Sequence, residues 1–247
     1  MEKVAILGCG WLGKQLAQSL IERGTHVIGS TTSAEKVSGL KAFGVDARIM
    51  NFLATDQQQI AEFIGDSKTA VILIPPKSPE YPEMLVRIRE STRVPIIFTS
   101  STSVYGQTSG TVTESSPVAD TVLARGEKAL TDATILRLAG LVGPGRHPVT
   151  SLSGRSGVAG PEAPINLIHS ADVVRAIIAC MDRSIRSQVI NVVAPYHPSR
   201  RDYYVAQAIS RGLPPPSFAD DKAGGKIFRS EKFADLLGFS PDPQLLQ

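Results

Sequence analysis

The chain has 247 residues, of which 42% are hydrophobic and 20% are charged, and its formal net charge is +3. A chain of this size and composition can bury the core of one large α/β domain, or of a main domain with a small satellite, so disorder is not expected. It contains no apolar run of the roughly 18 residues that a membrane span needs, and its first residues predict a strand rather than a signal peptide. We therefore expect a soluble, cytoplasmic protein without a membrane partner. The surplus of positive charge is small and scattered, which gives no reason to expect nucleic acid binding.

The cysteines and histidines do not form a pattern of their own. The chain has two cysteines, Cys9 and Cys180, no C-x-x-C pair and four scattered histidines. Neither a disulfide framework nor a metal site is indicated, so both cysteines are predicted to be reduced and structural.

In the first half of the chain, short β-branched runs alternate with longer helix-like stretches, a pattern typical of a parallel sheet covered by helices on both faces. The first helix places Leu12, Leu16 and Leu20 on one face, and Gly24 supplies its C-terminal cap. The predicted strands lie at residues 3–7, 26–29, 47–50, 69–74, 95–99 and 134–138. These six strands predict an α/β fold with a doubly wound parallel sheet.

The second half begins with residues 143–164, which are dense in Gly, Pro and Ser and predict a long loop without a core of its own. Loops of this length are usually lids or binding segments. The remaining predicted elements are a strand at 165–168, a helix from Ser170, a strand at 189–193, a helix at 199–211 and a last helix between Ser230 and Gly238. We expect a dinucleotide-binding core at residues 1–142 and a reduced substrate-binding part at 143–247, which includes the strand and helices that return to the core.

A glycine-rich turn joins the first strand to the first helix. Its residues follow the pattern G-x-G-x-x-G and are Gly8, Cys9, Gly10, Trp11, Leu12 and Gly13. In this strand-to-helix context the first glycine permits a tight turn, the second lets a pyrophosphate approach the backbone, and the third allows the helix to pack closely. Helix N-terminal N–H groups then bind the phosphate, and Trp11 and Leu12 cover the cofactor or the sheet. The alternative is that the glycines serve only a tight turn.

The end of the second strand bears on the choice of cofactor. NAD enzymes usually place a carboxylate there to bind the ribose hydroxyls, but this chain has Ser30, Thr31 and Thr32, followed by Lys36. An acid would repel a 2′-phosphate, so its absence favours NADP, while NAD stays open because the usual Arg is also missing. The hydroxyls have an alternative role as caps of the next helix.

Residues 98–106, which read FTSSTSVYG, resemble the fifth strand and catalytic-serine segment of the extended short-chain dehydrogenase/reductase superfamily. LRLAGLVGPG at 136–145, NLIHSADV at 166–173 and LGFSP at 237–241 resemble further elements of these NAD(P)-dependent epimerases and dehydratases. The resemblance runs through nearly the whole chain, whose short length implies a trimmed substrate domain similar to that of atypical members.

The resemblance implies an oxidoreductase or an epimerase/dehydratase-like enzyme that acts on a hydroxyl or carbonyl substrate, with a sugar nucleotide as one candidate. Ser101 matches the catalytic hydroxyl. The family's Tyr-x-x-x-Lys motif is absent, because no tyrosine is followed by lysine four residues later. Lys128 is preferred to Arg125 as the ribose-binding cation, and Tyr105 is a candidate proton donor. Loss of the usual acid–base group can cost about 100-fold to 10,000-fold in rate. A catalytically impaired NAD(P)-binding sensor or regulatory module therefore remains an alternative, and so does a structural protein with an empty cleft.

Further site residues are expected where the predicted strands end, because loops at the carboxyl edge of the sheet line the cleft. The expected cofactor-binding residues are Ile74, Pro75, Thr99 and Ser100, and the expected substrate-binding residues are Thr102, Arg146 and His147. A homodimer is plausible by analogy with the family.

Overall fold

The structure is a computed structural model that describes residues 2–106, 109–221 and 224–246. The chain divides into two compact units, each built from separate segments. The first unit comprises Met1–Val104, Ala119–Leu136 and Val174–Val189, and the second comprises Tyr105–Val118, Arg137–Val173 and Ile190–Gln247. A single boundary after residue 142 does not describe this division, because Tyr105–Val118 precedes it but belongs to the second unit, and Val174–Val189 follows it but belongs to the first.

A seven-stranded sheet has the order β10-β7-β5-β4-β1-β2-β3. Its strands are β1 (Lys3–Leu7), β2 (His26–Thr31), β3 (Asp46–Ile49), β4 (Thr69–Ile72), β5 (Ile96–Ser101), β7 (Thr134–Leu138) and β10 (Val189–Val192). β1 pairs in parallel with both β2 and β4, and these strands are buried, as expected for strands covered on both faces. The predicted doubly wound parallel sheet is confirmed. The chain winds outward in one direction from β1 and in the other from β4, so the crevice at their carboxyl ends is the expected ligand site.

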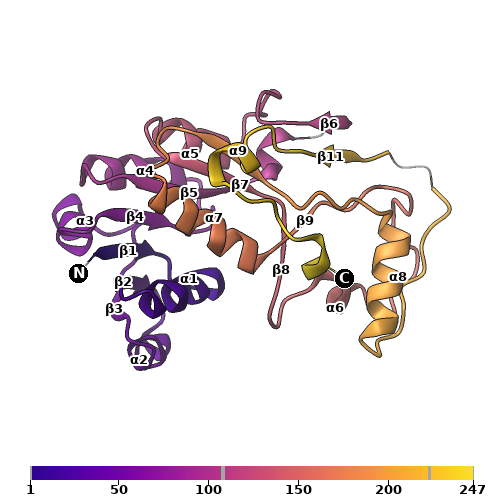
Figure 1. Cartoon of the computed structure of the whole chain (residues 1–247), viewed down its shortest axis with the longest axis horizontal. Helices are drawn as coiled ribbons and strands as arrows, with labels where there is room; N and C mark the ends of the chain where they lie inside the picture. The colour runs from indigo at the N-terminus through magenta and orange to yellow at the C-terminus, as the bar shows by residue number, and fades with distance from the viewer. Residues whose placement is uncertain (1, 107–108, 222–223, 247) are drawn as a thin grey trace. The chain divides into compact units, whose positions relative to one another are not determined.

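Most of the helices that flank this sheet are amphipathic and turn an apolar face inward, whereas α2 buries only Leu40. They are α1 (Trp11–Glu22), α2 (Ala34–Ala42), α3 (Gln57–Ile64), α4 (Tyr81–Glu90), α5 (Val122–Ala129) and α7 (Ser170–Asp182). α1 buries Leu12, Leu16 and Leu20 and stops before Gly24, whose φ of 78° supplies the predicted left-handed cap. α4 packs against both α3 and α5 (Figure 1).

The second unit contains two short sheets, and of their strands the sequence predicted only one, at 165–168. β6 (Gly110–Val112) pairs in parallel with β11 (Lys226–Phe228), and the two run side by side in Figure 1. β8 (Gly140–Val142) pairs with β9 (Leu167–His169). The helices of this unit are α6 (Pro148–Leu152), α8 (Arg200–Ser210) and α9 (Phe233–Leu237), followed by the 3₁₀ turn η2 (Pro243–Leu246). A second 3₁₀ turn, η1 (Thr102–Tyr105), begins in the first unit and ends at the first residue of the second.

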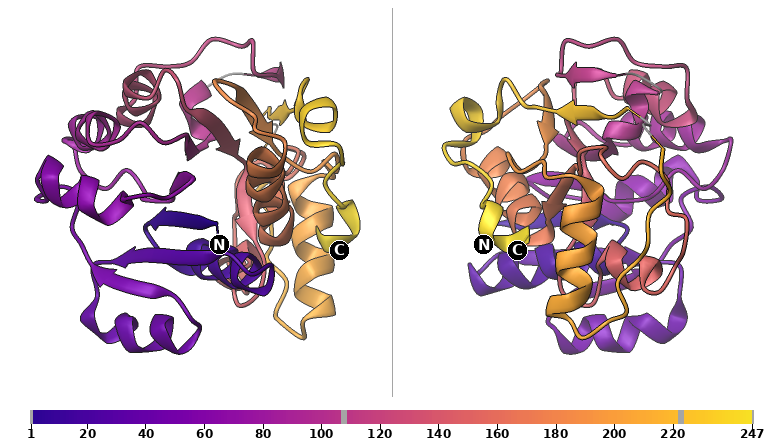
Figure 2. Two further views of the ribbon diagram at one scale, coloured as in Figure 1. Left: turned by 60° about the vertical axis from the view of Figure 1, so that its left-hand side comes forward. Right: turned by 90° about the vertical axis from the view of Figure 1, so that its right-hand side faces the viewer.

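The prediction that residues 143–164 form a loop without a core was wrong in part, since most of the segment is a loop but a short helix lies within it. The segment contains α6, which packs against α8 (Figure 2), and Val149 within it is fully buried. A five-residue helix with one buried side chain leaves no periodic pattern, which explains why the sequence did not reveal it.

No helix in the described ranges combines the length and apolar character required to cross a bilayer.

Candidate functional site

A cavity of about 350 Å³ lies in the first unit at the carboxyl ends of β1, β2, β3 and β4. Of the residues expected to bind a cofactor, those that line it are Gly8, Cys9, Gly10, Ser30, Thr31, Thr32, Lys36, Ile74 and Pro75. The lining residues that the sequence analysis missed are Met50, Asn51, Phe52, Leu53, Leu73, Lys77, Ser78, Tyr81 and Met84. Most of them follow β3 or β4 directly, so the rule that pointed to Ile74 and Pro75 also applies to them.

The three glycines of the turn differ in what requires them. Gly8 has a φ of +97°, and a Cβ there would lie 3.1 Å from Ile74 Cγ1. A Cβ on Gly13 would lie 2.8 Å from the Gly8 carbonyl oxygen, so only glycine allows α1 to pack this closely. A Cβ on Gly10 would meet nothing within 4 Å. Packing therefore does not explain Gly10, and the open space beside it fits a ligand that approaches the backbone.

This open space lies at the N-terminus of α1. Gly10 occupies the N-cap position without a side chain to cap the helix, and the first turn contains no acidic residue. The first N–H groups of a helix lack acceptors within it, and the helix dipole is positive at this end. The turn can therefore hold a phosphate. Leu12 and Gly13 are buried and do not line the cavity, and neither does Trp11.

The wall formed by the end of β2 is rich in hydrogen-bond donors. Ser30 Oγ accepts the Gly8 N–H at 2.8 Å, and Thr31 Oγ1 accepts the Ser33 N–H at 3.2 Å. Because each hydroxyl already accepts a backbone hydrogen, each retains its own hydrogen to donate. The charged residues that line the described cavity are Lys36 and Lys77, and none is a carboxylate. Donors of this kind suit a phosphate group, and they can also donate to ribose hydroxyls, which both donate and accept.

Cys9 lies in the turn itself and is buried. Burial raises the pKa of its thiol to about 11, although Lys14 acts in the opposite direction. The thiol is therefore neutral at physiological pH and does not repel an anion.

The serine segment ends β5. Thr99 and Ser101 lie on one face of the strand and are half-buried, whereas Ser100 points to the other face, where its hydroxyl donates to Glu127 Oε1 at 2.5 Å. Thr99 Oγ1 donates to the Ile72 carbonyl at 3.2 Å, and Ser101 Oγ accepts the Ser103 N–H at 3.1 Å. The Ser101 hydroxyl thus keeps a hydrogen to donate. Thr99, Ser100 and Ser101 do not line the cavity, and Thr102 is buried.

Tyr105 and Lys128 have surroundings that differ from those of an acid–base pair. Tyr105 is only 1% exposed; its hydroxyl donates to Asn191 Oδ1 at 2.7 Å and accepts from Arg137 Nη1 at 2.9 Å. Burial raises the pKa of Tyr105, while the bond from Arg137 lowers it. Lys128 is exposed on α5, where its neighbour Glu127 faces β5 instead. The tyrosine hydroxyl is committed to the second unit, and the lysine faces away from the strand.

His147 is the N-cap of α6. Its Nδ1 accepts the Val149 N–H at 3.1 Å, so in the neutral ring Nε2 carries the hydrogen and donates to the Tyr203 hydroxyl at 3.0 Å. Burial, with Arg211 as a secondary cause, lowers the pKa of His147 to about 4. Arg146 is exposed, and its backbone forms a bridge with Gly143.

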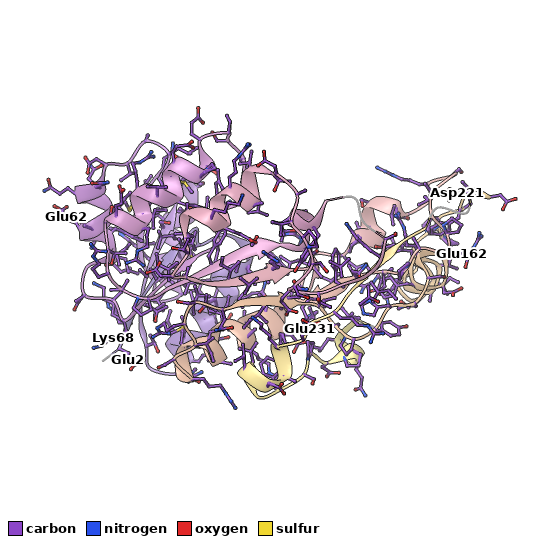
Figure 3. The ribbon with its side chains drawn as sticks, turned by 90° about the horizontal axis from the view of Figure 1, so that it is seen from above. Glu2, Glu62, Lys68, Glu162, Asp221 and Glu231 are labelled. Carbon is purple, nitrogen blue, oxygen red and sulfur yellow. The ribbon has the colours of Figure 1, made fainter. Side chains whose placement is uncertain are left out.

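The segment around Gly160 is held by acidic side chains. Both carboxylate oxygens of Asp221 accept the Gly160 N–H, at 3.0 and 3.1 Å, and Glu162 pairs with Arg201 at 3.5 Å. Asp221 and Glu162 are labelled in Figure 3. This part of the chain is therefore anchored within the second unit.

Comparisons with known proteins agree with this geometry. The family described as "NADP oxidoreductase coenzyme F420-dependent" matches residues 3–97. Protein YeeZ of Escherichia coli (strain K12) is 37% identical over 273 residues, a match that covers 100% of this chain and 99% of that protein. The UDP-glucose 4-epimerase of Thermotoga maritima, solved with UDP-glucose, is 16% identical, with a TM-score of 0.82 and coverage of 99% of this chain and 95% of the other. MoeE5, solved with UDP-glucose and NAD, is 18% identical, with a TM-score of 0.80 and the same coverage. These solved structures confirm the epimerase-like Rossmann fold.

Proposed function

Since the chain belongs to the family of the Escherichia coli protein YeeZ, we propose that it binds NADP(H) in the cleft of its first unit and acts as an oxidoreductase or epimerase on a hydroxyl or carbonyl substrate. The observation that carries this proposal is the open space beside Gly10 at the N-terminus of α1. No packing contact explains a glycine there, whereas the approach of a diphosphate to the backbone does.

The residues present fit the cofactor in its separate parts. The first turn of α1 would hold the diphosphate, and the hydroxyls of Ser30, Thr31 and Thr32 would face the adenosine ribose. Lys36, on the helix that follows β2, would meet a 2′-phosphate with an opposite charge. The absence of a carboxylate from the described lining supports NADP over NAD, because a carboxylate would repel the additional phosphate.

Bound NADP(H) supplies or accepts the hydride. Ser101 would donate its hydroxyl hydrogen to the substrate carbonyl oxygen and so favour the build-up of negative charge there. Its acceptor capacity is already partly used by the Ser103 N–H, which leaves the hydrogen for the substrate.

Calorimetry and turnover assays test the proposal in two stages. NADP should bind at least about tenfold more tightly than NAD, a difference of roughly 1.4 kcal/mol. A panel of carbonyl compounds and UDP-sugars should then contain a substrate that is turned over. A net oxidation or reduction changes the absorbance of the cofactor at about 340 nm, whereas an epimerisation regenerates the cofactor and is followed by chromatography of the sugar product. Ser101→Ala should lower kcat by about 100-fold. If neither NADP nor NAD binds, the first stage is contradicted. If Ser101→Ala leaves kcat unchanged, Ser101 has no part in the mechanism.

A second candidate function is an NADP(H)-binding sensor or regulatory module. Two observations favour it: the Tyr105 hydroxyl is committed to Asn191 and Arg137, and Lys128 lies on the exposed side of α5. This candidate predicts an increase in melting temperature with NADP but no turnover with any member of the panel. A reproducible, substrate-dependent oxidation of NADPH would decide against it.

A further inference from the structure

The helix α5 places a buried carboxyl group against the serine strand. Glu127 is 7% exposed and Ser100 is 5% exposed, and the Ser100 hydroxyl donates to Glu127 Oε1 at 2.5 Å. Burying a carboxyl group costs several kcal/mol unless hydrogen bonds compensate for lost hydration. The 2.5 Å separation is at the short end of the range for hydroxyl–carboxylate bonds, which are about twice as strong as neutral ones.

Close packing fixes the position of α5. A Cβ on Gly126, the residue before Glu127, would lie 2.8 Å from Leu85 Cδ1 and 3.3 Å from Tyr81 Cε1, both on α4. Tyr81 in turn donates its hydroxyl hydrogen to the Ile74 carbonyl at 2.5 Å, at the wall of the cofactor cleft. The carboxyl group of Glu127 is therefore presented to β5 from a helix that has little freedom to shift.

The bond to Ser100 has a direct consequence for Ser101. Adjacent side chains on a strand point to opposite faces, so a strand held through Ser100 on the α5 side directs Ser101 to the other side. On that side, Ser101 Oγ accepts the Ser103 N–H at 3.1 Å. Two hydrogen bonds, one on each face, thus define the direction of the Ser101 hydroxyl. Such preorganisation matters because small displacements of a reacting group reduce the rate steeply.

We propose that Glu127 is a positioning residue that acts through Ser100 to hold the Ser101 hydroxyl in the direction required to polarise a substrate carbonyl. This inference rests on the proposed function, in which Ser101 contacts the substrate. Glu127 itself does not contact the substrate.

The first test needs no substrate and uses the full chain loaded with NADP. The variants are Ser100→Ala, Glu127→Ala and Glu127→Gln, with Glu83→Gln on the exposed side of α4 as the matched control. Hydrogen exchange at the Ser103 amide should accelerate about tenfold in the two alanine variants, the effect of losing roughly one hydrogen bond. Exchange at the Ile28 amide in β2 and the Kd for NADP should stay within about twofold, because the cleft does not depend on this bond. Glu127→Gln should restore slow exchange at Ser103, since the amide oxygen still accepts the Ser100 hydroxyl.

The second test uses the substrate found by the panel. The alanine variants should lower kcat about tenfold with little change in KM, because Ser101 is present but poorly directed. Three exchange results would overturn the inference but not the proposed function: unchanged exchange at Ser103 in the alanine variants, equal acceleration at Ile28, or fast exchange at Ser103 in Glu127→Gln. The inference would also fail if Ser101→Ala lowered kcat while the alanine variants at Ser100 and Glu127 left kcat unchanged. Absence of NADP binding or of turnover with the whole panel would overturn the proposed function, and the inference with it.

Discussion

The substitution Gly10→Ala tests the cofactor site most directly, because the added methyl group would not collide with the rest of the fold. Gly10 has a φ of −83° and a ψ of −148°, and an added Cβ would meet nothing within 4 Å. The expected cost to the free energy of unfolding is below about 1 kcal/mol, the usual size of a change at a helix N-cap. The same Cβ would occupy the space through which a diphosphate approaches α1. We expect the affinity for NADP to fall at least about 100-fold, or roughly 2.7 kcal/mol.

A thermal shift assay converts this loss into a temperature. At an NADP concentration of about 100 times the Kd, binding stabilises the unmodified protein by roughly 2.7 kcal/mol. For 247 residues, an unfolding entropy of about 2.1 cal/mol/K per residue converts this free energy to about 5 °C. After a 100-fold loss of affinity, the same concentration equals the Kd and contributes only about 0.4 kcal/mol, less than about 1 °C.

Two further glycine substitutions act as controls. Gly13→Ala should destabilise the unliganded protein by about 1–3 kcal/mol, because its Cβ would lie 2.8 Å from the Gly8 carbonyl oxygen. Gly39→Ala, at an exposed position of α2 with nothing within 4 Å, should leave NADP binding unchanged. If Gly10→Ala retains the full thermal shift with NADP, the diphosphate does not lie at the N-terminus of α1 and the reasoning is refuted.

Three other outcomes are expected. Lys36→Ala should weaken NADP binding about tenfold and leave NAD binding within about twofold, as measured by calorimetry with Lys41→Ala as the control. Equal losses of affinity for both dinucleotides would exclude a contact between Lys36 and the 2′-phosphate. Tyr105→Phe should lower the free energy of unfolding in urea by about 1–3 kcal/mol, because Asn191 loses a buried partner; a loss of kcat at unchanged stability would instead make Tyr105 catalytic. The free energy of unfolding should fall as the pH decreases from 6.5 to about 4, since the unfolded state binds a proton that folded His147 resists. Urea titrations of His147→Asn, which keeps a capping side chain, should show a shallower fall, and an equal slope would contradict the cause given.

Elements governed by local patterns were predictable, and those that depend on distant partners were not. β1 lies at the predicted residues 3–7, and α1 ends where Gly24 was expected to stop it, because alternation, helical periodicity and capping are encoded within a few residues. β6 and β11 have three residues each and pair across more than a hundred positions of the sequence. Such short strands have no periodicity, so the sequence alone cannot reveal the pairing.

The same distinction applies to the site. The glycine turn and the end of β2 were found because their spacing reflects local backbone requirements. Ser100 was expected to bind the cofactor, but it faces α5 instead. The signal was present in the sequence: once Ser101 is assigned to one face of a strand, its neighbour belongs to the other. Glu127 gave no comparable signal, since one carboxylate in an amphipathic helix ordinarily indicates an exposed position.

The glycine turn does not depend on an acid–base pair, because different residues serve the fold, cofactor binding and catalysis. Gly8 and Gly13 are required by backbone conformation and packing, so selection for the fold alone would retain them, and neither is independent evidence for binding. Gly10, which no packing contact requires, is the glycine that bears on binding. Binding and catalysis are therefore tested by different positions, the first by Gly10 and the second by Ser101.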